Sequence, residues 1–344
     1  MGLVTFIIRR ILLMIPTILG VCVLIFAVVQ LLPISRRAML FITDPKELRM
    51  IPLIIQTYGL DQPVYVQFAT WMGQVLRGNF GWSELSQEPV LGAILVRLPA
   101  TVEIVLYSAP IIIFVGIYLG TLSASHRDKP IDHATRVMAI MGTSLPSFWI
   151  GIMLLSIFYA GLGWFAPSRY GNDVKVFIAT GGTWQWHTRL LTIDALLNGE
   201  LWIFIDALKH LVLPVAVLVL IQTALIMRVM RSSMLESLGK GYITAAMAKG
   251  LTQKEVINKH ARRNALIPVV TISGLLIAGM LTGLIITETV FNFPGIGSYA
   301  AQAAIRLDIA VVLGYALLSA ILFVVANLIV DILYAYIDPR IRLG

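Results

Sequence analysis

The residues that could do chemistry in this chain are spread thinly along it. The five histidines stand on separate segments: His126, His133, His187, His210 and His260. They form no H-E-x-x-H zinc pattern. The string from Leu238 to Gly241 lacks the glycine spacing and the Ser or Thr of a phosphate-binding loop, and Ser144 has no G-x-S-x-G context. We therefore expect a non-catalytic chain that itself binds no metal, ATP or other cofactor.

Long apolar runs dominate the rest of the chain and point to lipid as its solvent. Of the 344 residues, 58% are hydrophobic and 13% are charged, whereas about a quarter of the residues of a soluble domain are charged. A helix needs about 20 mostly apolar residues to cross the hydrocarbon core. Uncharged runs near or above this length cover 11–35, 104–125, 137–168, 211–227, 264–287 and 309–330. These runs predict an all-α integral membrane protein with six transmembrane helices.

The distribution of basic residues predicts the orientation of these helices. Arg9 and Arg10 precede an apolar run too long for a cleaved signal peptide, so we expect a retained first helix and a cytoplasmic N-terminus. With six crossings, the C-terminus and the second and fourth loops are cytoplasmic as well. These segments hold 15 of the 26 Lys and Arg residues although they are much the shorter. The net charge of +8 is thus a topology signal, and no basic stripe with interleaved aromatics indicates a nucleic-acid ligand.

The chain divides into three parts by composition. Residues 1–35 contain the first helix, residues 36–99 form an external region, and residues 100–344 contain the other five helices. Within the external region, apolar residues recur at helical spacing: Val64, Phe68, Trp71, Met72, Val75 and Leu76. This spacing predicts an amphipathic helix that packs on other helices or lies on the membrane. A second external segment, 164–209, contains Trp184, Trp186 and Trp202, and tryptophan favours the membrane interface.

The cytoplasmic segment 228–267 is too long for a simple turn. It has helix-forming residues around Ala245, Ala246 and Ala248, a break at Gly250, and a second helix that starts near Thr252. Thr252 followed by Glu255 fits a capping box. We expect two short helices that meet at the glycine and protrude from the membrane, a shape suited to docking into a groove on a partner.

Five strings, in this order, resemble the membrane subunits of dipeptide and oligopeptide ABC importers, which have the type I importer permease fold. They are IIRRILLMIPTILGV (7–21), YGLDQPVYVQFATWMGQVLRGNFG (58–81), GTSLPSFWIGIMLL (142–155), YITAAMAKGLTQKEVINKHARRNALIPVV (242–270) and ETVFNFPGIGSYAAQAAIRLDIAVVLGYALL (288–318). The resemblance covers nearly the whole chain. It implies a prokaryotic inner-membrane permease that works with a second homologous permease, two cytoplasmic ATPases that bind ATP and Mg, and an external solute-binding protein.

The resemblance also implies where the chain is coupled to its ATPase partners. In the family, a short Ala-rich helix and a glycine dock on the ATPase. The matching positions here are Tyr242, Thr244, Ala245, Ala246, Ala248, Lys249, Gly250 and Leu251. Along a translocation path for di- or oligopeptides, moved by alternating access, we expect Ser144, Pro146, Phe148, Gln222, Glu288 and Asn292. The alternative for this second set is structural, with Pro146 kinking the third helix and Gln222 joining helices by hydrogen bonds.

Two departures from the family pattern bear on function. Thr244 stands where broader importer families often have glutamate, which leaves docking intact. Pro33-Ile34-Ser35-Arg36 replaces the Gly-Asp-Pro that commonly follows the first helix, so oligosaccharides and nickel complexes stay open as alternative substrates. A more remote alternative is an ion-coupled secondary transporter, which would show related repeats and broken helices at mid-membrane.

Overall fold

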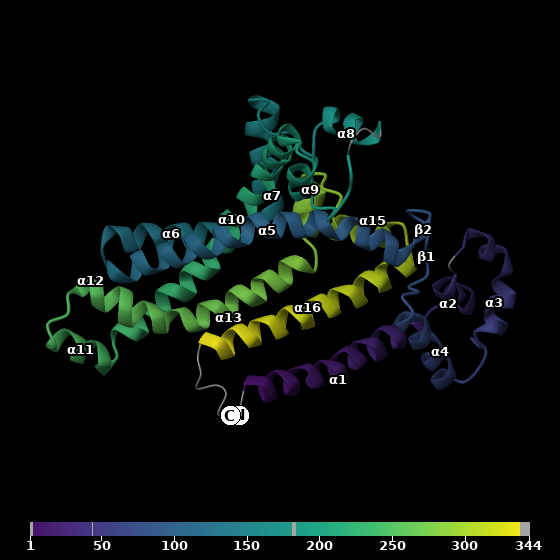
Figure 1. The fold of residues 1–344 in the computed structure, drawn as a ribbon, viewed down its shortest axis with the longest axis horizontal. Coiled ribbons are helices and arrows are strands. Elements are labelled where there is room, and N and C mark those ends of the chain that lie inside the picture. The colour runs from purple at the N-terminus through teal and green to yellow at the C-terminus, as the bar shows by residue number, and fades with distance from the viewer. Residues whose placement is uncertain (1–2, 43, 181–183, 338–344) are drawn as a thin grey trace.

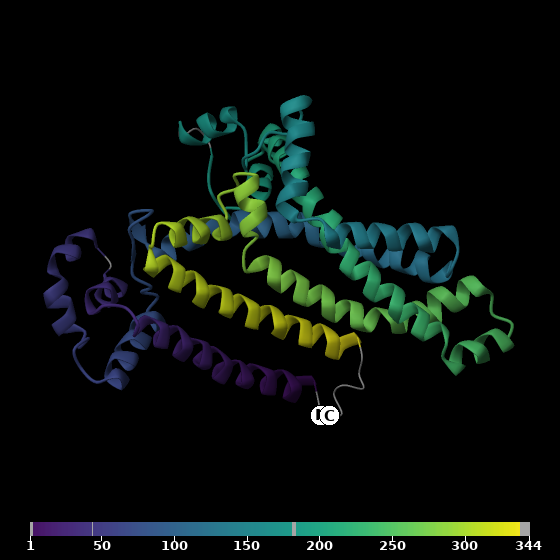
Figure 2. The ribbon, with the colours of Figure 1, turned by 180° about the vertical axis from the view of Figure 1, so that it is seen from behind.

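The computed structural model describes residues 3–42, 44–180 and 184–337, and it is built almost wholly of helices. The long helices run broadly along the long axis of the molecule (Figures 1 and 2). They are α1 (Leu3–Val29), α5 (Val90–Ser125), α10 (Leu201–Leu238), α13 (Arg262–Leu281) and α16 (Ile309–Ile337). Each is long and apolar enough to cross a membrane, α13 together with the helical turns that precede it. The predicted all-α membrane fold is confirmed.

The third predicted span is bent rather than straight. It consists of α6 (Pro130–Ser144) and α7 (Ser147–Leu154), which continues as a π-helix (Leu155–Gly161), and the two halves meet at 98°. Leu145 between them is extended, with ψ 131°, as expected for a residue that precedes a proline. The predicted kink at Pro146 is thus confirmed, and it turns α7 across the direction of the other long helices (Figure 1).

Helices α5 and α10 form the centre of the bundle and approach one another at glycines. A Cβ atom on Gly116 would lie 2.6 Å from the side chain of Ile226, and one on Gly120 would lie 2.7 Å from the carbonyl oxygen of Met227. Small residues allow such close crossings, which supply van der Waals contact where lipid removes the hydrophobic driving force. Buried side chains continue this core toward the end of α10, among them Met230 and Met234.

The N-terminal part lies beside α16. Arg10 of α1 forms an ion pair with Asp331 of α16, with 2.9 Å between Nη1 and Oδ2. Beyond α1 come α2 (Ile34–Ala38), two 3-10 helices (Met39–Phe41 and Pro45–Met50), α3 (Ile51–Thr57), α4 (Val64–Leu76) and the hairpin of β1 (Trp82–Ser83) with β2 (Glu88–Pro89). The predicted amphipathic helix is therefore confirmed as α4. Its Trp71 is buried and packs on Phe26 of α1, with ring centroids 5.7 Å apart.

The remaining elements lie on one side and at one end of the bundle. On the side, α8 (Asn172–Ala179) and α9 (Leu191–Leu197) form a unit whose small core is shared with Ile203 and Ala207 of α10, and α14 (Ile285–Val290) and α15 (Ile296–Ile305) lie close to it (Figure 1). We call residues 164–180 and 184–200 the external unit, after the side of the membrane predicted for them. At one end, α10 leads into α11 (Gly241–Ala248), α12 (Gln253–Glu255) and a π-helix (Val256–Ala261).

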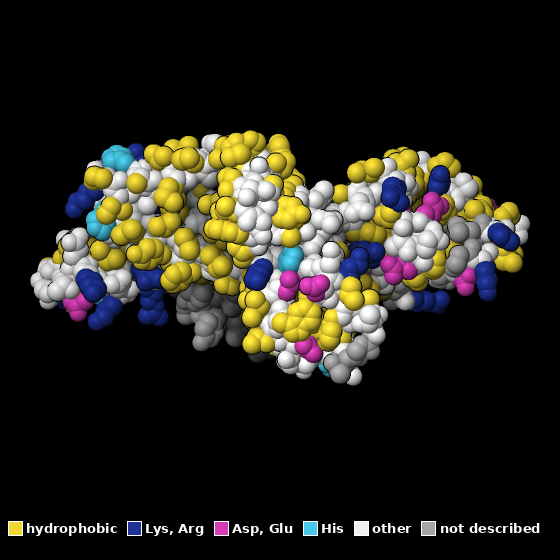
Figure 3. Space-filling view, turned by 90° about the horizontal axis from the view of Figure 1, so that it is seen from above, with side chains coloured by type: hydrophobic (Ala, Val, Ile, Leu, Met, Phe, Trp, Pro, Cys, Tyr) yellow, Lys and Arg dark blue, Asp and Glu magenta, His cyan; other side chains and the backbone are white. Residues whose placement is uncertain are grey.

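The surface agrees with a membrane protein. Apolar side chains on α1 and α6 are largely exposed, including Leu24 at 68% and Ile140 at 62%. Figure 3 shows hydrophobic side chains over the middle of the bundle, with Lys and Arg at both ends, the one that carries α11 and α12 and the one that carries α2 to α4. Exposed apolar surface of this extent requires lipid or a partner protein to cover it.

Candidate coupling and translocation sites

The segment predicted to dock on a partner forms a compact protrusion, which we call the knob (residues 239–261). Helices α11 and α12 meet at Gly250, whose φ of +83° is a left-handed conformation that favours glycine. The Thr252 hydroxyl accepts a hydrogen bond from the Glu255 N–H, and the Glu255 carboxylate accepts one from the Thr252 N–H at 3.1 Å. The two helices, the glycine break and the capping box are thus present as predicted. Figure 1 shows the knob at the left end of the molecule, opposite the end that carries α2, α3 and α4.

The predicted coupling residues divide between an inner and an outer face of the knob. Ala246 is buried and packs inward with Ile243, so it contributes to the core of the knob rather than to its surface. Leu251 is half-buried. The others are exposed on the outer face: Tyr242, Thr244, Ala245, Ala248, Lys249 and Gly250. Apart from its two chain neighbours, no atom lies within 4 Å of the position that a Cβ atom on Gly250 would take. The surface around the glycine is therefore open.

Hydroxyl groups fix the knob to the bundle. The Tyr242 hydroxyl hydrogen-bonds to the hydroxyl of Ser237, near the end of α10, and accepts a bond from the Asn264 side-chain amide at 3.2 Å. The Ser237 hydroxyl also donates to the carbonyl oxygen of Ala261 at 3.1 Å. These bonds join α10, α11 and the start of α13, so a force on the knob is transmitted to two long helices.

Three of the predicted path residues lie at the bend between α6 and α7. Ser144, Pro146 and Phe148 are exposed there. Helix α7 then crosses α14 closely, since a Cβ atom on Gly151 would lie 3.0 Å from the Val290 side chain. Gln222 is half-buried on α10, which α7 also contacts. A role of these residues in a translocation path stays a prediction.

Glu288 is buried and links its own helix to two others by hydrogen bonds. Its Oε1 accepts a 2.6 Å hydrogen bond from the Thr101 hydroxyl of α5, and its Oε2 accepts a 2.7 Å bond from the Ser298 N–H of α15. Burial raises the pKa of Glu288, and these hydrogen bonds oppose the rise. A side chain on Gly295 would collide with the carboxyl group. In this conformation Glu288 joins α5, α14 and α15 without facing an open space, whereas Asn292 is exposed in the following turn, with φ +51°.

Two arginine–carboxylate pairs were not predicted from the sequence. In the first, Arg169 of the external unit donates to Glu103 Oε2 of α5 from both Nε (3.0 Å) and Nη2 (2.8 Å). Glu103 Oε1 accepts from the N–H and the hydroxyl of Thr192. Glu103 immediately precedes the uncharged run 104–125, but its partner lies 66 residues away and no local pattern indicates it.

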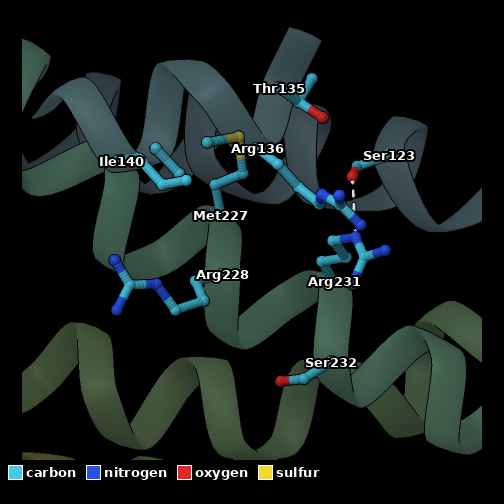
Figure 4. A pocket seen from close by; sticks show the side chains of 9 residues that line it. Ser123, Thr135, Arg136, Ile140, Met227, Arg228, Arg231 and Ser232 are labelled. Atoms are coloured by element: carbon cyan, nitrogen blue, oxygen red, sulfur yellow. Dashed lines mark hydrogen bonds between the residues drawn. The ribbon is translucent and has the colours of Figure 1, made fainter. Parts of the chain in front are cut away.

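The second pair joins α5, α6 and α10 at the knob end of the bundle. Arg231 donates to the two carboxylate oxygens of Asp132 at 2.7 and 2.8 Å, and the Ser123 hydroxyl donates to the same carboxylate at 2.6 Å. Beside this pair lies a pocket between α6 and α10 (Figure 4). Its volume is about 420 Å³. Its lining residues are Ser123, Thr135, Arg136, Ala139, Ile140, Met227, Arg228, Arg231 and Ser232.

The described part of the chain offers no group of three or more His, Cys, Asp or Glu residues that could hold a metal ion.

The chain matches two family models along nearly its full length. Residues 112–343 match the binding-protein-dependent transport system inner membrane component, and residues 3–106 match the N-terminal part of such membrane components. The chain belongs to this family. It is a multi-pass inner-membrane permease of a transport system, and the family assignment decides against an ion-coupled secondary transporter.

Curated relatives align with the permease from end to end. The di/tripeptide transport system permease protein of Pseudomonas aeruginosa is 38% identical and covers 99% of both chains. The probable D,D-dipeptide transport system permease protein of Escherichia coli is 37% identical over 94% of both chains. The oligopeptide transport system permease protein of Bacillus subtilis is 36% identical over 98% of this chain and 99% of its own length.

Proposed function

We propose that this permease forms one half of a translocation path for di- and oligopeptides, together with a second homologous permease. The names of the aligned relatives support peptides as the substrate class, because each of the three is named for the transport of peptides. The solute enters from an external solute-binding protein. Both termini of the chain face the cytoplasm.

The single observation that carries this proposal is the form of the knob. It presents exposed small residues around an unobstructed Gly250, and it is tied to α10 and α13 by the Ser237, Tyr242 and Asn264 side chains. Such a rigid protrusion can receive a displacement and pass it to the long helices. One of two cytoplasmic ATPases docks here, and ATP binding switches the path from inward to outward facing. Nucleotide and solute each shift this equilibrium only as far as they bind one state better than the other.

The chain itself contributes no catalysis in this proposal. ATP and Mg are bound by the partner ATPases, and no cofactor is bound by the permease. The absence of a phosphate-binding loop pattern from its sequence supports this division of labour.

The test is Gly250→Trp in the reconstituted complex of both permeases, the ATPases and the binding protein. The indole blocks the surface around position 250, so we expect transport and ATPase co-purification to fall at least tenfold while the permease still inserts into the membrane. Transport is measured as uptake of a labelled dipeptide into proteoliposomes.

Gly250→Asn is the matched control. Asparagine tolerates the left-handed conformation and is small, so it separates backbone strain from steric blocking. We expect it to retain most of the transport. Full transport by the Trp variant, or equal loss in both variants, contradicts docking at this surface.

A further inference from the structure

The pocket between α6 and α10 holds more positive charge than its acidic neighbours offset. Of its three arginines, Arg231 is neutralised by the buried carboxylate of Asp132. The other two have weak polar contacts only: Arg136 Nη2 lies 3.4 Å from His133 Nδ1, and Arg228 Nη2 lies 3.4 Å from Thr143 Oγ1. Neither has a carboxylate partner among the described residues. The pocket thus carries two uncompensated guanidinium groups.

The two unpaired arginines stand at the boundary of apolar sequence. Arg136 immediately precedes the uncharged run 137–168, and Arg228 immediately follows the uncharged run 211–227. Arg136 is six residues beyond the start of α6, about 9 Å along the helix. In the proposed orientation both guanidinium groups therefore lie where the cytoplasmic leaflet changes from hydrocarbon to headgroups.

Much of the rest of the pocket is apolar, and this apolar lining continues onto the exposed surface of α6. Ala139, Ile140 and Met227 line it. Ile140 is 62% exposed, and its neighbours Val137 and Met141 on α6 are more than half exposed. Figure 4 shows Arg136 reaching from α6 toward Arg231 of α10, with Ile140 and Met227 on the adjacent walls. A ligand here meets positive charge at one part and an apolar track at another.

We propose that this pocket binds the headgroup phosphate of an anionic phospholipid from the cytoplasmic leaflet, with an acyl chain along the exposed face of α6. Arg136, which reaches toward Arg231, contacts the phosphate. Arg228, whose side chain points to the other side of the pocket (Figure 4), attracts the phosphate through its charge, and the Ser232 hydroxyl is within the same lining. Basic pockets between transmembrane helices on the cytoplasmic side suit such headgroups. The bound lipid fills the space between α6 and α10 and so stabilises the bent third span against the central helix.

The amphipathic lining favours a lipid over a free dipeptide carboxylate. A small hydrophilic peptide would leave the apolar walls in contact with water, whereas an acyl chain covers them. The proposal rests on the orientation proposed above, but it does not require that the transported solute is a peptide.

The experiment measures phosphatidylglycerol binding to the purified complex of both permeases and the ATPases. The complex is titrated with phosphatidylglycerol or phosphatidylcholine in detergent and analysed by native mass spectrometry. A surface arginine contributes about 1 kcal/mol to anionic lipid binding, or about fivefold in affinity. We expect about fivefold weaker phosphatidylglycerol binding for Arg136→Gln, about fivefold for Arg228→Gln, and roughly 30-fold for the double variant, with phosphatidylcholine binding unchanged.

Two variants control for charge and folding. Arg136→Lys with Arg228→Lys keeps both charges, so we expect most of the affinity to return. Arg127→Gln with Lys129→Gln removes two nearby charges outside the pocket, and we expect less than a twofold effect. Equal binding of the two lipids by the unaltered complex overturns the proposal, as does equal loss in the pocket and control variants. Displacement of the lipid by a soluble dipeptide overturns the proposal in favour of a solute subsite. Labelling of the start of α6 by a membrane-impermeant reagent added outside the cell overturns the orientation, and with it the leaflet assigned to the lipid.

Discussion

The two buried arginine–carboxylate pairs hold opposite ends of the permease in different ways. Glu103 and Arg169 are both sealed from solvent, with side chains 1% and 8% exposed, and they fasten the external unit to α5. Asp132 is equally buried, but its partner Arg231 is 22% exposed and borders an open pocket. Arg169 also borders a pocket, of about 350 Å³, but its side chain is almost fully buried, whereas Arg231 offers more of its surface to a ligand or to water.

This difference suggests different tasks for the two ends. Glu103 also accepts two hydrogen bonds from Thr192, and Arg169 donates to the Arg189 carbonyl, so the bonds of the external pair tie one unit to α5. The inner pair joins three bundle helices at the end where the knob would receive a displacement. We infer that the external end is a fixed platform and that the inner end is where helix packing can change.

The largest expected effect tests the sealed pair. Glu103→Gln leaves the Arg169 guanidinium buried without a counter-charge, and removal of one partner of a buried pair costs about 3 to 5 kcal/mol. We expect this loss in the free energy of unfolding, measured by denaturant titration of the purified permease. Adding Arg169→Gln removes the stranded charge and should restore part of the stability. An effect below 1 kcal/mol would show that the pair is not enclosed.

A smaller effect is expected for the equivalent change in the inner pair. Asp132→Asn also removes a buried carboxylate, but Arg231 can turn toward water through the pocket, so we expect a loss of about 2 kcal/mol. The same titration measures it. The comparison breaks down if Asp132→Asn costs as much as Glu103→Gln.

The hydroxyl groups around the two carboxylates give the finest comparison. Thr192→Val removes one donor to Glu103 and keeps the side-chain shape, and we expect a loss of about 1.5 kcal/mol. Ser123→Ala removes a donor to Asp132 that pocket water can replace, so about 0.5 to 1 kcal/mol is expected. Hydrogen exchange at the neighbouring backbone amides provides an independent check. A larger effect for Ser123 than for Thr192 reverses the proposed assignment of fixed and adaptable ends.

Local patterns in the sequence were sufficient for much of the fold. Long uncharged runs predicted the spans, the spacing of Phe68 and Trp71 predicted α4, and the Thr252–Glu255 pair predicted the capped start of α12. Pro146 predicted the kink, but not its 98° angle, because that angle depends on how α7 packs against α10 and α14.

Contacts between residues far apart in the sequence could not be predicted from local patterns. Asp132 and Arg231 lie 99 residues apart, and nothing near either residue specifies the other. Glu288 was predicted to lie along a translocation path. Its hydrogen-bond donors Thr101 and Ser298 come from α5 and α15, so its role as a link between helices is visible only in three dimensions. Ala246 matched the coupling motif by sequence, yet helical periodicity beside Ile243 turns it inward.

The account depends most on the knob facing the cytoplasm and touching an ATPase. The single cysteine of the permease, Cys22, is buried in α1, so after Cys22→Ala one introduced cysteine can be followed on its own. We therefore place a cysteine at the exposed position 248 (Ala248→Cys) in intact cells that also express the partner ATPases. The account predicts that a membrane-impermeant maleimide leaves it unlabelled, and that a short bifunctional crosslinker that enters the cell joins it to an ATPase. Labelling from outside the cell, or crosslinking to no nucleotide-hydrolysing protein, contradicts the account.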